Sequence, residues 1–332
     1  MKSYNQSSER VGYIDTVAGI MIIWMILGHC RFHANYSLPF FKYLGFYMPW
    51  FFYKSGMFFS TLNQKSLFKK DLSKLLSRYI IYSLYGWLIW STCGIIDGSL
   101  SIKKCIVSPL FDFIHHGSIY GNGALWFLLS LFFVRQLANW LLKQKLPPPI
   151  LSLFFCALAF LLYAIGWYQY SWWLGNILSG TCFFILGNWL RSIETKRWVF
   201  FLALFTYFVI LLASIEGWIE DFPYMYMHAN KMNNGNYLLF YPMSLAGIIV
   251  INNIFKLLCK YIRFRVFDYV GYNSMQYYVT HWIFLIIVLF VAKYVFNVND
   301  SFEQFIILLG ACMTLLPIVV GITKSMMIKN VK

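Results

Sequence analysis

Runs of about 20 apolar residues alternate with shorter polar stretches along almost the whole chain. A helix needs about 20 such residues to cross the roughly 30 Å hydrocarbon core of a bilayer. Ten segments come close to this length: 11–30, 43–62, 79–97, 123–142, 150–166, 172–190, 198–214, 237–255, 271–292 and 302–323. Backbone groups in lipid must be paired within their own segment, and the alternating strands of a barrel are missing. The pattern therefore predicts an all-α, polytopic membrane protein with about ten transmembrane helices.

The connections between these segments indicate one continuous unit. No polar block is long enough to fold alone, so residues 1–332 are expected to form a single transmembrane domain. The first apolar run ends in Gly28-His29-Cys30-Arg31 without a small-residue cleavage site, which favours a retained helix over a secretory signal. Two predicted loops, 98–122 and 215–236, are long, and loops of such length often carry function.

Composition and charge support the membrane assignment. Hydrophobic residues make up 60% of the chain and charged residues 12%, against roughly 45–50% and 25% in soluble domains. The net charge is +15, and with a cytoplasmic N-terminus 19 of the 27 Lys and Arg residues fall in inside segments and only 6 outside. This asymmetry predicts that both termini are cytoplasmic (N-in/C-in), in a multi-pass protein of the cell (inner) membrane. The positive charge is thus a topology signal, and we expect no nucleic-acid partner.

Ionisable side chains inside the spans are the candidates for chemistry, because placing them in a membrane is costly. They are Asp15, His29, Lys54, Arg135 and His281. His29 ends the first span, and a histidine titrates near neutral pH, so it could take a proton from a hydroxyl that attacks a thioester. The alternative is an interfacial histidine bonded to a loop. The seven scattered cysteines and the pair His115-His116 lack metal-ligand spacing, so no metal site is expected.

Six motifs occur in order along the chain. They are Tyr13-Ile14-Asp15 with Gly19 and Gly28-His29; Met48-Pro49-Trp50-Phe51-Phe52 with Ser55-Gly56; a basic stretch from Lys69 to Arg78; Leu125-Trp126-Phe127-Leu128; Phe183-Phe184 with Gly187; and Gly271-Tyr272-Asn273-Ser274 with Tyr278 and His281. This series resembles the acyltransferase-3 family of membrane glycan O-acyltransferases, which includes fucose 4-O-acetylase-like enzymes.

The resemblance implies an O-acyltransferase that acts on carbohydrate. It would move an acetyl or other acyl group from acetyl-CoA, or another acyl-CoA, to a hydroxyl of a cell-surface or lipid-linked glycan. Acyl-CoA would be a co-substrate that approaches from the cytoplasm, with no resident cofactor. In this scheme His29 is the catalytic base, Trp126 lines the pocket near the donor, and His281 lies where the acceptor binds.

One departure from the family pattern concerns the donor. The family usually has Arg or Lys eleven residues before the histidine, a cation associated with acyl-CoA binding, and this chain has Ala18. Lys54 lies at a similar depth on the second span and is expected to replace that cation. Asp15 is fourteen residues before His29, about 21 Å along a helix, so it cannot orient His29. It could instead hold a cation at the donor end.

The remaining candidates have two interpretations each. Arg135 could bind the phosphates of acyl-CoA or reach to the membrane surface as a structural residue. Asn122 and Asn273 could contact the acceptor or fix helix ends, and His281 could equally be a hydrogen-bonded packing residue. Two rival functions stay open: a polytopic transporter or glycan flippase, which also has charges in mid-membrane, and a catalytically impaired family member, given Ala18.

Overall fold

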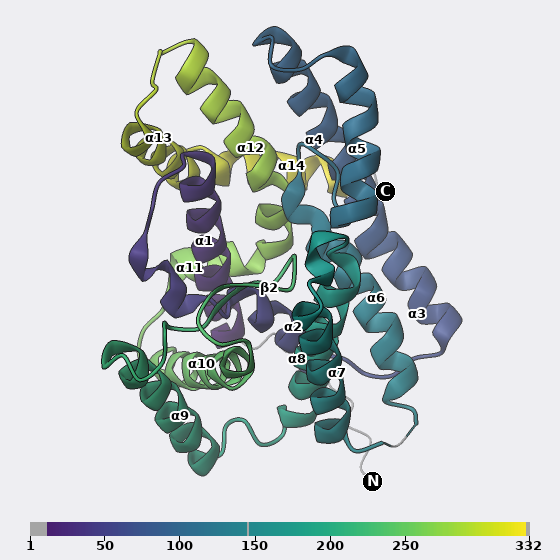
Figure 1. The fold of residues 1–332 in the computed structure, drawn as a ribbon, viewed down its shortest axis with the longest axis vertical. Helices are drawn as coiled ribbons and strands as arrows, with labels where there is room; N and C mark the ends of the chain where they lie inside the picture. The colour runs from purple at the N-terminus through teal and green to yellow at the C-terminus, as the bar shows by residue number, and fades with distance from the viewer. Residues whose placement is uncertain (1–11, 145, 330–332) are drawn as a thin grey trace.

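The computed structural model describes residues 12–144 and 146–329, and almost all of its regular structure is helical (Figure 1). Its elements, in chain order, are α1 (Gly12–His33), the 3₁₀ helix η1 (Pro39–Leu44), α2 (Tyr47–Met57), α3 (Gln64–Asp71), the π-helical turn η2 (Leu72–Leu76), α4 (Ser77–Ile96), α5 (Ile102–His116), the 3₁₀ helix η3 (Gly123–Leu125), α6 (Trp126–Leu141), α7 (Pro148–Ala164), the 3₁₀ helix η4 (Trp167–Gln169), α8 (Trp173–Leu190), α9 (Arg197–Ile215), β1 (Tyr224–Tyr226), β2 (Lys231–Asn234), α10 (Tyr237–Leu258), α11 (Arg265–Tyr272), α12 (Ser274–Tyr294), α13 (Ser301–Thr314) and α14 (Leu316–Lys329).

The predicted all-α membrane architecture is confirmed, whereas the count of ten spans is not. Among the described residues, six helices are long and apolar enough to cross a bilayer, or seven if α13 and α14, bent by 43°, form one span. The predicted span 43–62 contains only the 11-residue α2, which covers about 16 Å. Helix α7 has 17 residues, and α8 interrupts its apolar sequence with Asn176 and Asn188. The predicted spans 43–62, 150–166 and 172–190 therefore contain no helix that passes this test of length and hydropathy.

The two predicted long loops are largely ordered, which corrects the expectation for 98–122. Most of that segment is helix α5 (Ile102–His116). Its N-cap is Ser101, whose side chain accepts from the Lys104 amide, and its C-cap is Gly117 with φ 71°. The segment 215–236 contains β1 and β2, which pair antiparallel with Met225 opposite Met232. Both segments therefore hold a defined conformation at the end of the bundle where His29 lies.

Helix α1 lies at the centre of the packing, against α2, α10, α11, α12 and α13. A second group joins α2, α7 and α6 to α8, while α4 packs on α12 and α9 on α10. Helix α9 buries only Val199, Ala203 and Ile210, which share one face, and the rest of its apolar surface suits lipid. One hydrophobic core cluster extends from Ile14 to Val320 and connects these groups.

Glycines of the sequence motifs form two pairs of very close helix contacts. A Cβ atom on Gly56 of α2 would lie 1.8 Å from the Phe184 carbonyl oxygen, and one on Gly187 of α8 would lie 2.0 Å from the Tyr53 oxygen. In the same way, Gly19 of α1 meets Phe267, and a Cβ on Gly271 of α11 would lie 1.7 Å from the Asp15 oxygen. Only glycine permits such backbone contact, so these motif glycines set the positions of α2 and α11.

Some segments predicted near the same side of the membrane contact each other. The Trp172 amide, at the predicted outer end of span 172–190, donates to the His115 carbonyl (2.8 Å), and Asn176 Nδ2 in the same span donates to the His228 carbonyl (2.9 Å). Predicted inside segments also meet, as Lys143 Nζ donates to the Leu62 carbonyl at 2.6 Å. Of the residues in the charge count, Lys2, Arg10, Lys145 and Lys332 lie outside the described residues, as does the first residue of span 11–30.

Replacing Gly187 by Ala should destabilise the bundle, because the new methyl group meets the Tyr53 carbonyl oxygen at 2.0 Å. Overpacking of this kind costs about 1–3 kcal/mol or more. The matched control is Gly310→Ala in α13, where a Cβ meets nothing within 4 Å. Thermal unfolding in detergent should show a lower Tm for Gly187→Ala than for the unaltered protein, and an unchanged Tm for Gly310→Ala. Equal Tm values for the two variants would contradict the close-contact assignment.

The sidedness can be checked by cysteine labelling after the seven native cysteines are replaced. Ser99 and Ser66 are both exposed and lie in segments predicted on opposite sides. A membrane-impermeant maleimide applied to intact cells should label Ser99→Cys, whereas Ser66→Cys should react only after permeabilisation, because its segment carries the Lys-rich inside charge. The reverse pattern would invert the orientation.

Candidate active site

His29 lies near the end of α1, where a second histidine and a tryptophan hold its ring. Its Nδ1 lies 2.7 Å from Nε2 of His281 on α12, and the two rings are within 9° of parallel. The indole of Trp282 meets the His29 ring edge-on, with centroids 4.8 Å apart. The His29 ring therefore has one defined orientation, set by His281, 252 positions away in sequence, and by its neighbour Trp282.

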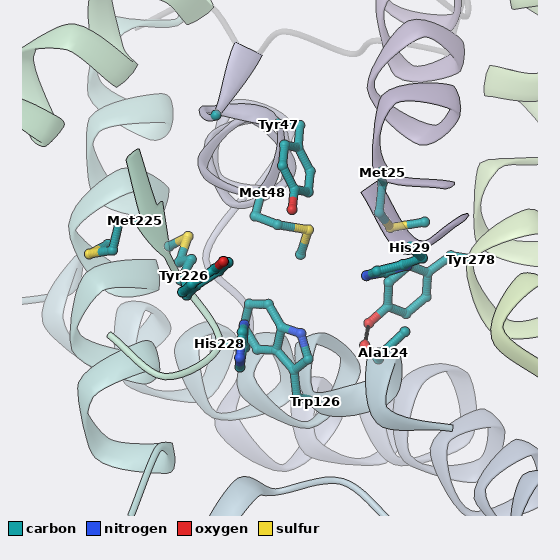
Figure 2. A pocket seen from close by; sticks show the side chains of 12 residues that line it. Met25, His29, Tyr47, Met48, Ala124, Trp126, Met225, Tyr226, His228 and Tyr278 are labelled. Carbon is teal, nitrogen blue, oxygen red and sulfur yellow. Dashed lines mark hydrogen bonds between the residues drawn. The ribbon is translucent and has the colours of Figure 1, made fainter. Parts of the chain in front are cut away.

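The bonds of His281 determine which nitrogen of His29 is free. Nδ1 of His281 lies 3.0 Å from the Tyr277 carbonyl oxygen and 2.8 Å from that of Tyr278. A carbonyl only accepts, so the Nδ1 of His281 carries the proton and its Nε2 is an acceptor. His29 Nδ1–H must then donate to that acceptor, which leaves the lone pair of His29 Nε2 unused. Figure 2 shows a ring nitrogen of His29 directed into the adjoining cavity.

This cavity, called here the histidine cavity, is small and is built from several distant segments (Figure 2). Its lining consists of Met25, His29, Gly45, Tyr47, Met48, Ala124, Trp126, Met225, Tyr226, Met227, His228 and Tyr278. Its volume is about 40 Å³, and one water needs about 10–15 Å³ on this measure. The space fits a reacting hydroxyl and its neighbours but not a whole sugar ring, so a larger acceptor must displace side chains at the mouth.

The turn of the β1–β2 hairpin forms one wall of the histidine cavity, and polar anchors fix its position. Asn230, at φ 52°, donates to the Ala159 carbonyl (2.8 Å) and accepts from Ser179 Oγ (2.8 Å) and Tyr237 OH (2.6 Å). Asn176 holds the His228 carbonyl, and Ser130 Oγ donates to Asn176 Oδ1 at 2.7 Å. These bonds tie the turn to α7, α8 and α10.

His228 is the site residue that sequence reasoning missed. Burial, together with the neighbouring His116, lowers the pKa of His228 to about 4, so its imidazole is neutral at pH 7. The sequence feature that could have pointed to this site is the apolar and aromatic run from Tyr224 to Met227, which lies in a segment between predicted spans. Such a run is too short to cross a bilayer, and its side chains need another protein surface to cover them.

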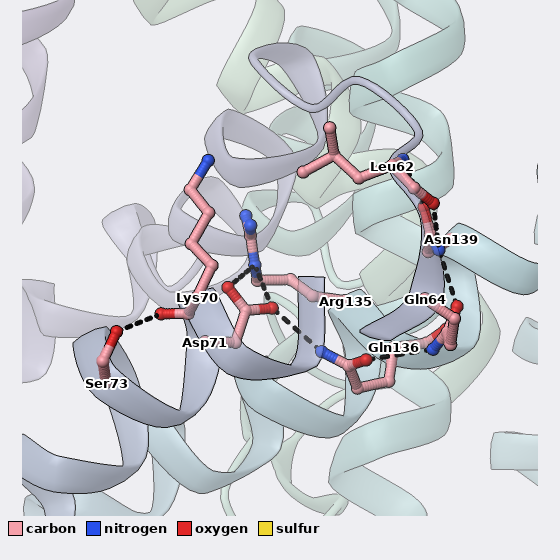
Figure 3. A network of polar contacts seen from close by, with 8 residues as sticks. All are labelled: Leu62, Gln64, Lys70, Asp71, Ser73, Arg135, Gln136 and Asn139. Carbon is pink, nitrogen blue, oxygen red and sulfur yellow. Dashed lines mark hydrogen bonds and ion pairs between the residues drawn. The ribbon is translucent and has the colours of Figure 1, made fainter. Parts of the chain in front are cut away.

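A second cavity, called here the basic cavity, lies between α3–η2–α4 and α6. Its volume is about 450 Å³, and its charged lining residues are Lys70, Lys74, Arg78 and Arg135 with the single acid Asp71. Arg135 Nε donates to both Asp71 oxygens, at 3.1 and 2.9 Å, and Gln136 adds a bond of 3.0 Å (Figure 3). The π-helical turn η2 lies within this lining, and π-turns in long helices are frequent at functional sites.

An aromatic layer separates the two cavities. On α6, Trp126 lines the histidine cavity and Leu131 lines the basic cavity. On α12, Tyr278 lines the histidine cavity and Met275 lines the basic cavity. Phe127 packs on Tyr278 with ring centroids 5.5 Å apart and on Phe52 at 4.8 Å. The hydroxyl of Tyr278 donates to the Ala124 carbonyl, which fixes that ring. The two cavities are therefore close neighbours with rings packed between them.

The predicted site residues divide among these places. His29 and Trp126 line the histidine cavity, and Arg135 lines the basic cavity. His281 is fully buried, lies behind His29 and bonds to it, so it positions that ring and is not part of the lining. Its predicted contact with an acceptor stays untested.

The other four predicted residues lie outside the lining of both cavities. Asn122 Nδ2 donates to the Val279 carbonyl (3.0 Å), and Asn273 accepts from Lys324 Nζ (2.8 Å), so both join helix ends. Asp15 lies in the first turn of α1, where α11 packs. Lys54 Nζ lies 5.2 Å from the ring centroid of Trp50, a cation–π contact.

The described ranges contain no group of three or more His, Cys, Asp and Glu side chains arranged to hold a metal ion. The histidine cavity offers one basic nitrogen, one neutral imidazole and aromatic walls, while the basic cavity offers cationic side chains. The first arrangement suits proton abstraction from a hydroxyl, and the second suits a polyanion.

Comparison with known families gives one match. A family model described as an acyltransferase domain matches residues 11–323, which is nearly the whole chain. Neither a curated protein nor a solved structure matches it.

The Asp71–Arg135 pair should be strongly coupled, because the two side chains are 3% and 17% exposed. Arg135→Met leaves a buried carboxylate without its cation and should cost about 3–5 kcal/mol. Adding Asp71→Leu removes that charge, so the double variant should regain much of the lost stability. Thermal unfolding in detergent measures the stability of Arg135→Met, of Asp71→Leu and of the double variant. If the double variant loses as much stability as the two single variants together, the side chains are not coupled.

Proposed function

The chain belongs to the acyltransferase-3 family, and from this premise we propose that it is an O-acyltransferase that transfers an acyl group from acyl-CoA to a sugar hydroxyl. Its family and its apolar helices make it a multi-pass membrane acyltransferase. The proposed donor is acetyl-CoA or another acyl-CoA, and the proposed acceptor is a cell-surface or lipid-linked glycan. The proposed location is the cell (inner) membrane.

The observation that carries this proposal is the His29–His281 pair beside the histidine cavity. His29 Nε2 takes the proton of the acceptor hydroxyl while that oxygen attacks the thioester carbonyl carbon. The new C–O bond forms, the C–S bond breaks, and the proton passes from His29 to the departing CoA sulfur. During the step His29 becomes positive, and its Nδ1–H bond to His281 strengthens, because a charged donor bonds more strongly than a neutral one.

The basic cavity supports the proposed place of the donor. Lys70, Lys74 and Arg78 surround a space of about 450 Å³ in segments predicted on the cytoplasmic side. Asp71 takes only the Nε of Arg135, and within the described residues no hydrogen bond occupies its two Nη groups, so they are available to an anion. CoA carries three phosphate groups, and clustered cations bind phosphate strongly. The acyl thioester would then extend past the aromatic layer toward His29.

The missing cation at Ala18 bears on the donor arm. Ala18 is fully buried in the core around α1, so no charge occupies that position. Lys54 is half-buried on the short helix α2, and its ammonium lies over Trp50. We propose that Lys54 supplies the cation that the first helix lacks, with Asp15 acting at the same inner end. An impaired enzyme is the alternative, and the transfer assay decides between them.

His29→Ala should abolish acyl transfer while expression and membrane insertion persist. Loss of a general base lowers the rate by about 10²–10⁴-fold. Transfer of labelled acetyl from acetyl-CoA to membrane glycan measures it, with His115→Ala as the control. His115 is exposed and is not part of the cavity lining, so its replacement should leave the rate unchanged. Normal glycan acetylation by His29→Ala would eliminate the assigned base.

A further inference from the structure

Two histidines from unrelated parts of the chain face the histidine cavity. His29 comes from α1, and His228 comes from the turn between β1 and β2. Figure 2 shows the two rings across the cavity from each other, with Trp126 beside His228. The proposed mechanism gives His29 a task and leaves His228 without one.

The surroundings of His228 hold its ring while leaving its nitrogens available. Trp172 meets the ring edge-on, with centroids 4.6 Å apart, and Tyr226 lies at 5.8 Å. The backbone carbonyl of His228 accepts from Asn176 at 2.9 Å. No hydrogen bond to either imidazole nitrogen occurs within the described residues. The side chain is half-buried and lines the histidine cavity, so its nitrogens can reach a ligand there.

The protonation state of His228 limits what it can do. A neutral imidazole has one N–H donor and one acceptor nitrogen. Trp172 also packs on His116, with centroids 3.8 Å apart, and His116 pairs with Asp112. A positive charge near His116 disfavours a second positive charge on His228, in the same direction as its burial. His228 can therefore donate a hydrogen bond but is a poor source of a proton.

We propose that the N–H of His228 donates a hydrogen bond to the thioester carbonyl oxygen and stabilises the negative charge that develops there. This rests on the proposed acyl transfer. His29 accepts the hydroxyl proton, the acceptor oxygen bonds to the carbonyl carbon, and its C=O electron pair moves onto the oxygen that faces His228. The oxyanion then collapses, the C–S bond breaks, and His29 returns the proton to sulfur. His228 keeps its proton throughout.

The hairpin anchors give this donor a fixed place before substrate arrives. Asn230, two residues after His228, is buried and bonded to three helices. A preorganised donor in a water-poor site needs no reorientation during the reaction, and removing one such donor lowers kcat by about 10²–10³-fold. The effect is expected in kcat and not in the KM for acyl-CoA, because the charge on oxygen exists only in the transition state.

The test compares His228→Met with His228→Gln. The two replacements have similar length and flexibility, but only Gln carries an N–H donor. Met suits the lining, which already contains four methionines. With acetyl-CoA and membrane glycan as substrates, His228→Met should lower kcat by about 10²–10³-fold with little change in the KM for acetyl-CoA. The kcat of His228→Gln should be at least about tenfold higher than that of His228→Met. His228→Phe, which keeps the aromatic packing, should behave like Met. The Tm in detergent confirms that each variant is folded.

Each outcome decides the matter. Equal kcat values for Met and Gln, or normal kcat in either Met or Phe, would overturn the role of His228. The role of His228 is also overturned if Trp126→Phe, which removes the indole N–H from the lining, reproduces the loss in kcat while His228→Met does not. An inactive His29→Ala beside a fully active His228→Met leaves the proposed function standing and rejects this inference alone. Absence of transfer by the unaltered protein rejects the proposed function itself.

Discussion

Backbone contact at two glycine pairs is the constraint on which the remaining geometry depends. In lipid, apolar surface gives little drive for helix association, so close packing must supply it. Gly56 and Gly187 bring α2 and α8 together, and Gly19 and Gly271 bring α1 and α11 together. Helix α12 begins two residues after α11 ends, so the second contact also helps to set where His281 meets α1. A shift of an ångström at either pair would reach the cavity walls.

The sequence predicted the membrane class, most helix positions and the two histidines of the central pair. It could not predict that His29 and His281 bond directly, since ring orientation depends on Trp282 and on the carbonyls of α12. Arg135 was found as a candidate, but its partner Asp71 was hidden in a stretch that reads as a solvated basic loop. The count of ten spans is not confirmed, because a short element such as α2 can be apolar when other helices, not lipid, surround it.

Proposed donor and acceptor chemistry fall in separate cavities that share α6 and α12. The two parts of the proposed reaction need different surroundings, and separate cavities can provide both. Phosphate groups bind best beside cations and water, whereas a neutral base and a neutral hydrogen-bond donor act best where water is excluded. The hairpin contributes a second wall of the histidine cavity and is anchored to α7 through Asn230. Its residues were least visible in the sequence, because a turn buried by long-range hydrogen bonds has no periodic pattern.

The aromatic layer of Phe52, Phe127 and Tyr278 has a further consequence for the cell. A protein hollowed from both membrane faces risks becoming an ion leak, and each elementary charge that crosses releases about 2.3 kcal/mol per 100 mV of potential. The rings of Phe52, Phe127 and Tyr278 pack together between the two cavities, with centroids 4.8 and 5.5 Å apart. Apolar constrictions of this kind block hydrated ions by dewetting. We therefore expect the same rings that separate the two halves of the proposed reaction to limit the leakage of ions across the membrane.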